Sequence, residues 1–93
     1  MREKEIEQRF AKQIKRMGGL ALKFVSPGFD GMPDRMVLLP GGRVSFVEVK
    51  AEGKKPRPLQ LSRMRMLREL GFPTYILDGL DKVEEVIDEI RAT

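Results

Sequence analysis

The sequence predicts an α/β protein in which a mixed four-stranded sheet is packed by flanking helices, with the element order αβββαβα. Three observations support this fold class. Apolar residues recur with a helical period near both ends of the chain and again after its middle. Three runs typical of strands follow one another between residues 20 and 50, and a fourth short run, residues 74–77, lies between two helical segments. A strand reached through a helix can join the sheet parallel to its neighbour, so we expect a mixed sheet.

The first half of the chain is expected to form one helix and three strands. The helix fits residues 3–17, where a single apolar stripe repeats every three or four positions before two glycines end it. The strands are expected at residues 20–25, 35–39 and 43–50, with a loop at 26–33. The segment Pro40-Gly41-Gly42 makes a tight turn between the last two strands, which predicts an antiparallel hairpin.

The second half is expected to add a helix, a strand and a last helix. Residues 52–58 are too rich in glycine, proline and charge to continue a strand, and a helix fits residues 59–70. This helix is expected to turn four apolar side chains inward: Leu59, Met64, Leu67 and Leu70. The apolar run 74–77 is typical of a strand covered on both faces. The last helix, residues 81–91, should bury Val83, Val86, Ile87 and Ile90.

Length and composition indicate a single domain, residues 1–93. The chain is 41% hydrophobic and 34% charged, and no apolar run approaches the ~18 residues of a membrane span. The charged N-terminus lacks a secretory signal, which predicts a cytoplasmic protein. Histidine and cysteine are absent, which excludes thiolate or imidazole metal sites, cysteine nucleophiles and histidine bases. Catalysis would therefore need carboxylates, lysine, hydroxyls and a bound metal, whereas a binding module would need none of them.

Charge is distributed unevenly along the chain. Residues 1–68 carry 16 Lys and Arg against 7 Asp and Glu, whereas residues 69–93 carry 2 against 7. Within residues 50–68 there are seven basic residues and one acidic residue. This basic segment favours a polyanionic partner such as nucleic acid, with a solvated basic helix face as the alternative.

Two carboxylates and a lysine are predicted to meet at one end of the hairpin. Side chains alternate across a strand, so Glu48 and Lys50 lie on the same face of strand 43–50. The preceding loop, rich in glycine and proline, turns tightly before Asp34. Because the start of one hairpin strand lies opposite the end of the next, Asp34 should approach both residues in space.

Such a cluster suits phosphodiester hydrolysis. Carboxylate oxygens favour Mg²⁺ or Mn²⁺, which keeps bound waters that can attack a phosphate. The lysine can orient that water or stabilise charge on the phosphate. The alternative is a simple ion pair between Glu48 and Lys50 at a solvent-facing edge, without a function.

The motif GMPDRMVLLPGGRVSFVEVK, followed by KKPRPLQL, resembles the virus-type replication-repair nuclease (VRR-NUC) domain. This family is a branch of the PD-(D/E)xK, or restriction-endonuclease-like, superfamily. The resemblance extends from EKEIE at the N-terminus to GFPTYILD near the C-terminus. Its specificity lies in the combined order and spacing of these pieces. The resemblance implies a restriction-endonuclease-like fold.

The resemblance also implies roles for individual residues. Asp34 and Glu48 would bind Mg²⁺, for which Mn²⁺ can substitute, with the backbone carbonyl of Val49 as a third ligand. Lys50 would be the catalytic lysine. Gln60 matches a glutamine typical of the family and would orient the site; the alternative is a polar residue at the start of a helix.

The family carries a further glutamate on its first helix, and the sequence offers two candidates for it. Glu3 and Glu7 are four residues apart and share a helix face. The motif EKEI places Glu3 like the usual family glutamate. The distance from Glu7 to Gly18 resembles that in archaeal junction resolvases of the same superfamily. Glu7 is slightly favoured.

Stand-alone members of this size resemble phage-encoded proteins, which would place the protein in the host cytoplasm. The resemblance implies cleavage of branched DNA, including Holliday junctions, by a homodimer with one site for each scissile strand. The alternatives are a non-catalytic branched-DNA-binding or assembly module and a monomeric flap or nicking nuclease. The residues expected to contact DNA phosphates are Lys54, Lys55, Arg57, Arg63 and Arg65.

Overall fold

The structure, a computed structural model, describes residues 2–93 and confirms the predicted element order. The main elements are α1 (Glu3–Arg16), β1 (Leu20–Lys23), β2 (Arg35–Leu39), β3 (Arg43–Val49), α2 (Pro58–Glu69), β4 (Thr74–Leu77) and α3 (Val83–Arg91). A short 3₁₀ turn, η1 (Leu80–Lys82), precedes α3 in the segment where the sequence predicts the first turn of the last helix. None of the helices in residues 2–93 has the length and apolar character that crossing a membrane requires.

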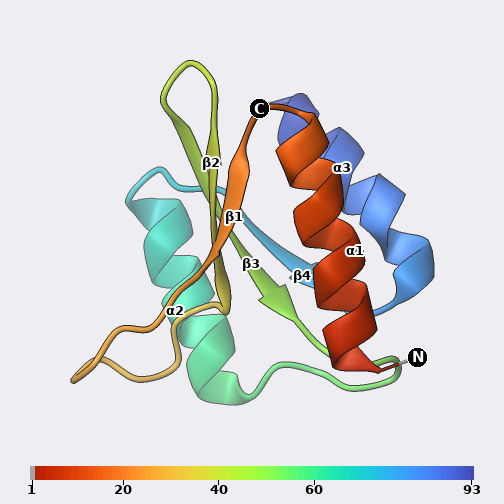
Figure 1. Ribbon diagram of the computed structural model, residues 1–93. Helices are drawn as coiled ribbons and strands as arrows, with labels where there is room; N and C mark the ends of the chain where they lie inside the picture. The colour runs from red at the N-terminus through yellow and green to blue at the C-terminus, as the bar shows by residue number, and fades with distance from the viewer. Residues whose placement is uncertain (1) are drawn as a thin grey trace.

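The four strands form one mixed sheet in the order β1-β2-β3-β4 (Figure 1). The first three strands pair antiparallel, and β4, which is reached through α2, pairs parallel to β3. The mixed sheet and the hairpin are therefore as expected. In the hairpin, Arg35 lies opposite Val47, so the residue before β2 comes next to the end of β3.

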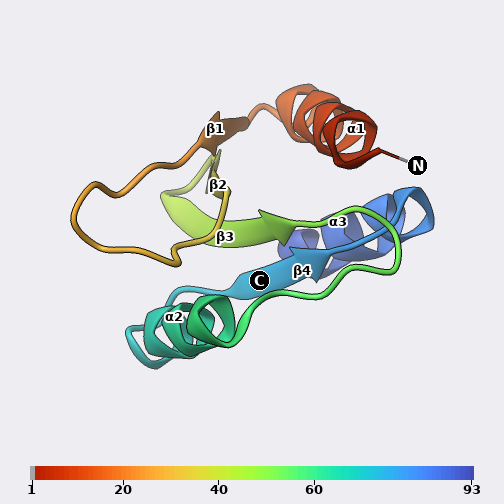
Figure 2. The same cartoon turned by 90° about the horizontal axis from the view of Figure 1, so that it is seen from below.

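The helices cover the two faces of the sheet unequally. Helices α1 and α3 lie together on one face, and α2 lies on the other (Figure 2). The main core forms under α1 and α3 from Val37, Val47, Val49 and Leu77 of the sheet and apolar side chains of the two helices. Because side chains alternate along β3, the residues between these valines point toward α2 instead.

Helix α2 confirms half of its predicted inward stripe, because Met64 and Leu67 are buried as expected. Leu59 and Leu70, expected inward, are 43% and 69% exposed, so this part of the prediction was wrong. The buried side chains are Gln60, Met64 and Leu67. The prediction considered apolar residues alone, whereas the inward stripe begins with a polar residue that meets a buried carboxylate of β3.

Two strands are less enclosed than expected. Strand β1 ends at Lys23 rather than at residue 25. Strand β4 was expected to be covered on both faces, but Ile76 is 37% exposed, because β4 is an edge strand that α2 covers incompletely. Leu20 and Leu22 of β1 are also exposed on the face opposite α1 and α3, since α2 lies under the β3–β4 side of the sheet (Figure 2). We call this uncovered part of β1 and β2 the open sheet face.

Candidate active site

Asp34 directly precedes β2 and lies beside the end of β3. The backbone N–H of Val49 donates a hydrogen bond to Asp34 Oδ2 at 3.1 Å. The carbonyl of Asp34 accepts the N–H of Phe24 at 2.7 Å, which closes the base of the loop between β1 and β2. The hairpin register and these two contacts fix the carboxylate at the place that the sequence predicts.

Glu48 is 1% exposed and points from β3 toward α2. Its Oε2 accepts hydrogen bonds from Gln60 Nε2 at 2.8 Å and pairs with Lys50 Nζ at 3.2 Å. The prediction that Glu48 and Lys50 are neighbours is therefore confirmed. The Lys50 side chain is 20% exposed, whereas the carboxylate that its amine contacts is buried.

Gln60 combines the two interpretations that the sequence left open. Its Oε1 accepts the backbone N–H of Arg57 at 2.8 Å, which satisfies a free donor at the start of α2. Its Nε2 holds Glu48. The same amide group therefore caps the helix and orients the buried carboxylate.

Burial raises the pKa of both carboxyls. For Asp34 the largest cause is desolvation, which the hydrogen bond from Val49 partly offsets and the nearby charge of Glu7 reinforces. For Glu48 desolvation again dominates, the charge of Asp34 raises the pKa further, and Lys50 lowers it. Two ionised carboxylates at this place repel each other, so the site favours an added cation.

The donor set fits a divalent metal ion. Glu48 Oε1 is buried and has no hydrogen-bond partner among the described residues, which calls for an explanation in a folded protein. Within residues 2–93 no three Asp, Glu, His or Cys side chains gather into a metal site. Mg²⁺ is commonly held by one or two carboxylates and completes its shell with water, so the pair Asp34 and Glu48 suffices for it. Val49 follows Glu48 in β3, and its backbone N–H bonds to Asp34.

The first helix brings Glu7 close to Asp34. Glu7 Oε1 accepts Arg35 Nε at 2.7 Å and pairs with Arg35 Nη2 at 2.6 Å. Glu3, Glu7 and Asp34 line one cavity of about 260 Å³. Glu3 is exposed, whereas Glu7 is half-buried and ion-paired, so the geometry favours Glu7 as the helix carboxylate.

Arg35 was not singled out from the sequence, although it ties α1 to the sheet. Its guanidinium also donates to the carbonyl of Ala21 at 2.7 Å. Strand alternation puts Arg35 on the same face as Val37, under α1. A charge on an otherwise apolar strand face needs a partner, and that is the signal that could have predicted the contact with Glu7.

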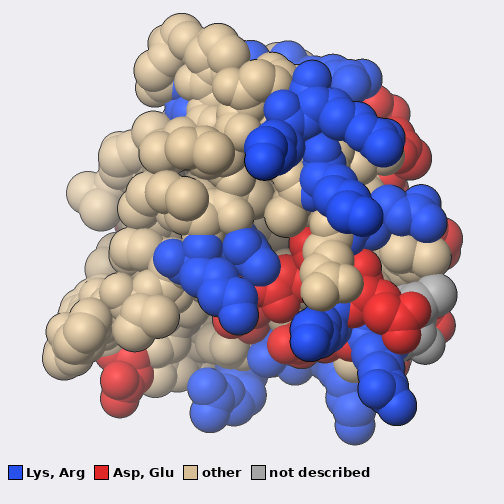
Figure 3. Space-filling model, in the orientation of Figure 1, with Lys and Arg blue, Asp and Glu red and all other residues tan. Residues whose placement is uncertain are grey.

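The predicted DNA contacts differ in their surroundings. Lys54, Lys55, Arg57 and Arg65 are exposed. Arg63 is half-buried, and its guanidinium lies 3.9 Å from the centre of the Phe29 ring. In Figure 3, acidic side chains gather in a recess near the N-terminal end of α1, and Lys and Arg side chains surround it. This arrangement can attract a phosphate backbone around an acidic centre.

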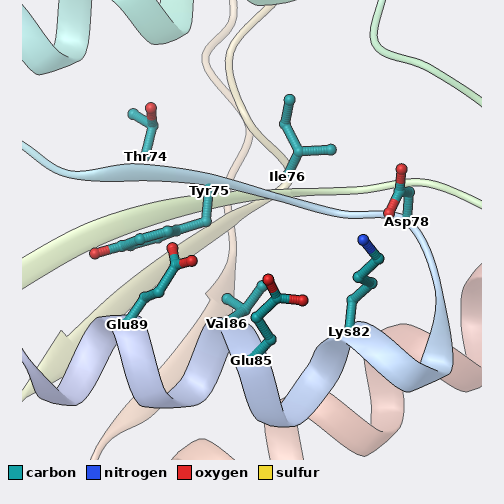
Figure 4. A pocket seen from close by; sticks show the side chains of 8 residues that line it. All are labelled: Thr74, Tyr75, Ile76, Asp78, Lys82, Glu85, Val86 and Glu89. Carbon is teal, nitrogen blue, oxygen red and sulfur yellow. The ribbon is translucent and has the colours of Figure 1, made fainter.

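A second cavity, of about 360 Å³, lies between β4 and α3 and contains none of the predicted site residues. Figure 4 shows Asp78, Glu85 and Glu89 around it, with Lys82 as its one basic residue. Three carboxylates against one amine repel phosphate. This cavity is therefore unsuited to nucleic acid, and the active-site candidate remains the cluster at the end of β3.

Comparison with a solved structure defines the class of protein. The chain superposes on a VRR_NUC domain with a TM-score of 0.84 and 28% identity, covering 92% of this chain and 94% of the other. The fold is that of a restriction-endonuclease-like nuclease domain. No family model matches the sequence.

A curated relative identifies the family. The chain is 47% identical over 81 residues to "Putative nuclease p44" of Acyrthosiphon pisum secondary endosymbiont phage 1, covering 87% of each chain. The chain belongs to the VRR-NUC family. The resemblance seen in the sequence is thereby confirmed.

Proposed function

We propose that this protein is a Mg²⁺-dependent endonuclease that hydrolyses phosphodiester bonds in branched DNA and resolves Holliday junctions. The observation that carries the proposal is the buried Glu48, whose Oε1 lacks a partner among the described residues while Asp34 lies beside it. A buried carboxylate oxygen left without a partner costs free energy unless a ligand compensates it. The phage relative, named as a nuclease, supports the general activity.

Asp34 and Glu48, with the carbonyl of Val49, would hold the ion, which would stabilise negative charge on the phosphate and make a water more acidic. Gln60 keeps Glu48 in one orientation through the 2.8 Å hydrogen bond. Lys50 lies 3.2 Å from Glu48 and is partly exposed, so its amine would orient the attacking water or a phosphate oxygen.

The exposed lysines after β3 support binding to the DNA backbone. Lys54 and Lys55 follow the active-site strand directly and are exposed. Phosphate contacts of this kind position DNA without reading its sequence. A preference for branches must then come from the spacing of two sites, which leads to a homodimer.

The open sheet face supports that dimer. Leu20 and Leu22 are 51% and 43% exposed on one side of the same strand. Uncharged surface extends over the β1–β2 side of the molecule in Figure 3, and an exposed apolar patch is typical of a protein interface. A second copy packed there by two-fold symmetry would carry a second site for the opposite strand of a junction.

The test compares a labelled four-way junction, a flap and a linear duplex of matched sequence, each with Mg²⁺ and with EDTA. We expect paired cuts in the junction with Mg²⁺ alone and binding of the junction under both conditions. Binding without cleavage would favour a non-catalytic module. Cleavage of the flap but not the junction by a monomer would favour the flap nuclease.

A further inference from the structure

Arg63 is occupied by a neighbouring loop instead of pointing freely to the solvent. Its Nε donates to the backbone carbonyl of Asp30 at 2.8 Å, and its guanidinium stacks over the Phe29 ring at 3.9 Å. Both partners belong to the loop between β1 and β2, which extends beside α2 (Figure 1). The neighbouring Arg65 is exposed and makes neither of these two contacts with the loop.

This loop leads directly to Asp34. Gly31 packs so closely against α2 that a Cβ there would lie 2.7 Å from Leu59 Cγ, and its φ of +88° also disfavours other residues. Gly28, at the exposed tip, has a φ of +81° and no neighbour within 4 Å of a Cβ position. Glycine loses more conformational freedom on folding than other residues, so contacts with α2 help to hold the loop in one conformation.

Helix α2 therefore fixes both carboxylate-bearing segments. Gln60 holds Glu48 directly at 2.8 Å. Arg63, one turn later on the same helix, holds the loop whose end carries Asp34. Metal and catalytic sites need their groups placed to within about 0.5 Å, so a loop that shifts at its α2 contact would displace Asp34 from Glu48.

We propose that Arg63 is a positioning residue for the metal site, which sets Asp34 against Glu48 through the loop, and that it is not a phosphate contact. This proposal rests on the proposed function for the identity of the ligand. The loop contacts themselves do not depend on it. Arginine suits this task because its planar guanidinium can stack and donate at once, which lysine cannot do.

The experiment compares Arg63→Ala with the matched control Arg65→Ala. Mn²⁺ binding to DNA-free protein, followed by electron paramagnetic resonance, should weaken about tenfold or more in Arg63→Ala, as for loss of a residue that orients a ligand. It should be unchanged in Arg65→Ala. Junction affinity in EDTA is then measured against salt concentration. The slope of log affinity against log salt should fall by about 0.9 in Arg65→Ala, as for the loss of one phosphate contact. It should stay as in wild type in Arg63→Ala.

A measurement without metal tests the role of Arg63 independently of the proposed function. The Val49 amide donates to Asp34 Oδ2, so its hydrogen exchange reports whether Asp34 is in place. Exchange should accelerate in Arg63→Ala and Arg63→Lys, and stay as in wild type in Arg65→Ala. Phe29→Ala should act like Arg63→Ala, and the double variant should be no worse than either alone.

The outcomes are distinguishable. Arg63→Ala with unchanged Val49 exchange and a reduced salt slope would overturn the proposal and restore the phosphate contact. Wild-type protein that binds no Mn²⁺ would defeat the proposed function, while Val49 exchange would still decide the role of Arg63. Melting temperatures of all variants show whether the fold is retained.

Discussion

The two faces of the sheet differ in what they bury. Under α1 and α3 the sheet packs mainly valine and leucine against apolar helix stripes, and that core includes Val47 and Val49. Glu48 lies between these two valines on the same strand and points toward α2. It is equally buried, and it accepts a hydrogen bond from Gln60 of that helix. Burial of apolar groups stabilises the fold, whereas burial of a carboxylate costs free energy. One face of the sheet therefore stabilises the fold, whereas the other holds a buried carboxylate oxygen, Glu48 Oε1, without a hydrogen-bond partner among the described residues.

Catalysis at the end of β3 should show the largest change. Asp34→Ala or Glu48→Ala should lower the cleavage rate on the order of 10³-fold, because each removes a proposed metal ligand. Junction affinity in EDTA should stay near wild type, since the basic segment is untouched. Single-turnover cleavage and gel-shift titration measure the two quantities. Turnover within a few-fold of wild type in either variant would end the assignment of the site.

Lys50→Ala should have a smaller effect, about 10²-fold on the rate, because the amine acts on water or phosphate. Its ion pair with Glu48 is lost, but the three candidate ligands, Asp34, Glu48 and the carbonyl of Val49, remain. Mn²⁺ binding measured by calorimetry should therefore persist. If it disappeared with Lys50, the lysine would have a structural role.

The free energy of unfolding should depend mainly on the core under α1 and α3. Ile87→Ala, at a fully buried position of α3, should lower the free energy of unfolding by about 2–5 kcal/mol. Leu22→Ala, on the open sheet face, should change the unfolding of the monomer by less than about 0.5 kcal/mol. Urea denaturation compares the two. Analytical ultracentrifugation of Leu22→Ala tests whether the open sheet face supports self-association. If the variant dimerises as wild type does, the dimer interface does not include this face.

The smallest expected effect is a change in pH dependence. Burial, and then the charge of Asp34, raise the pKa of Glu48 above its ordinary 4.5. Because the folded-state pKa lies above the unfolded one, the associated stability is full at pH below 4.5 and is lost as the pH rises through the raised value. In EDTA, the melting temperature of Glu48→Gln relative to wild type should therefore increase from about pH 4 to about pH 7. If the melting temperatures of the two proteins changed in parallel with pH, ionisation of Glu48 would not destabilise the fold.

The sequence predicted those parts of the molecule that depend on local pattern. Hairpin register and strand alternation were enough to bring Asp34, Glu48 and Lys50 together. The inward stripe of α2 was predicted only in part. Met64 and Leu67 are buried as expected, but the stripe also includes Gln60, whose burial depends on a partner in another element.

The long-range partners of two arginines also escaped prediction. Arg35 meets Glu7 across 28 positions, and Arg63 meets Asp30 across 33. Neither pair has a periodic signature, because each depends on how a helix is placed against the sheet. A basic residue in a basic segment therefore resembles a phosphate contact until its tertiary partners are known.

The proposed metal site consists of the half-buried Asp34 and the buried Glu48 at the end of β3. Titration of DNA-free protein with Mn²⁺, followed by electron paramagnetic resonance, tests it directly. We predict one bound ion per chain in wild type and in Glu85→Gln, an exposed control on α3, and a loss of at least about tenfold in affinity in Glu48→Gln. Wild-type affinity in Glu48→Gln would contradict the account.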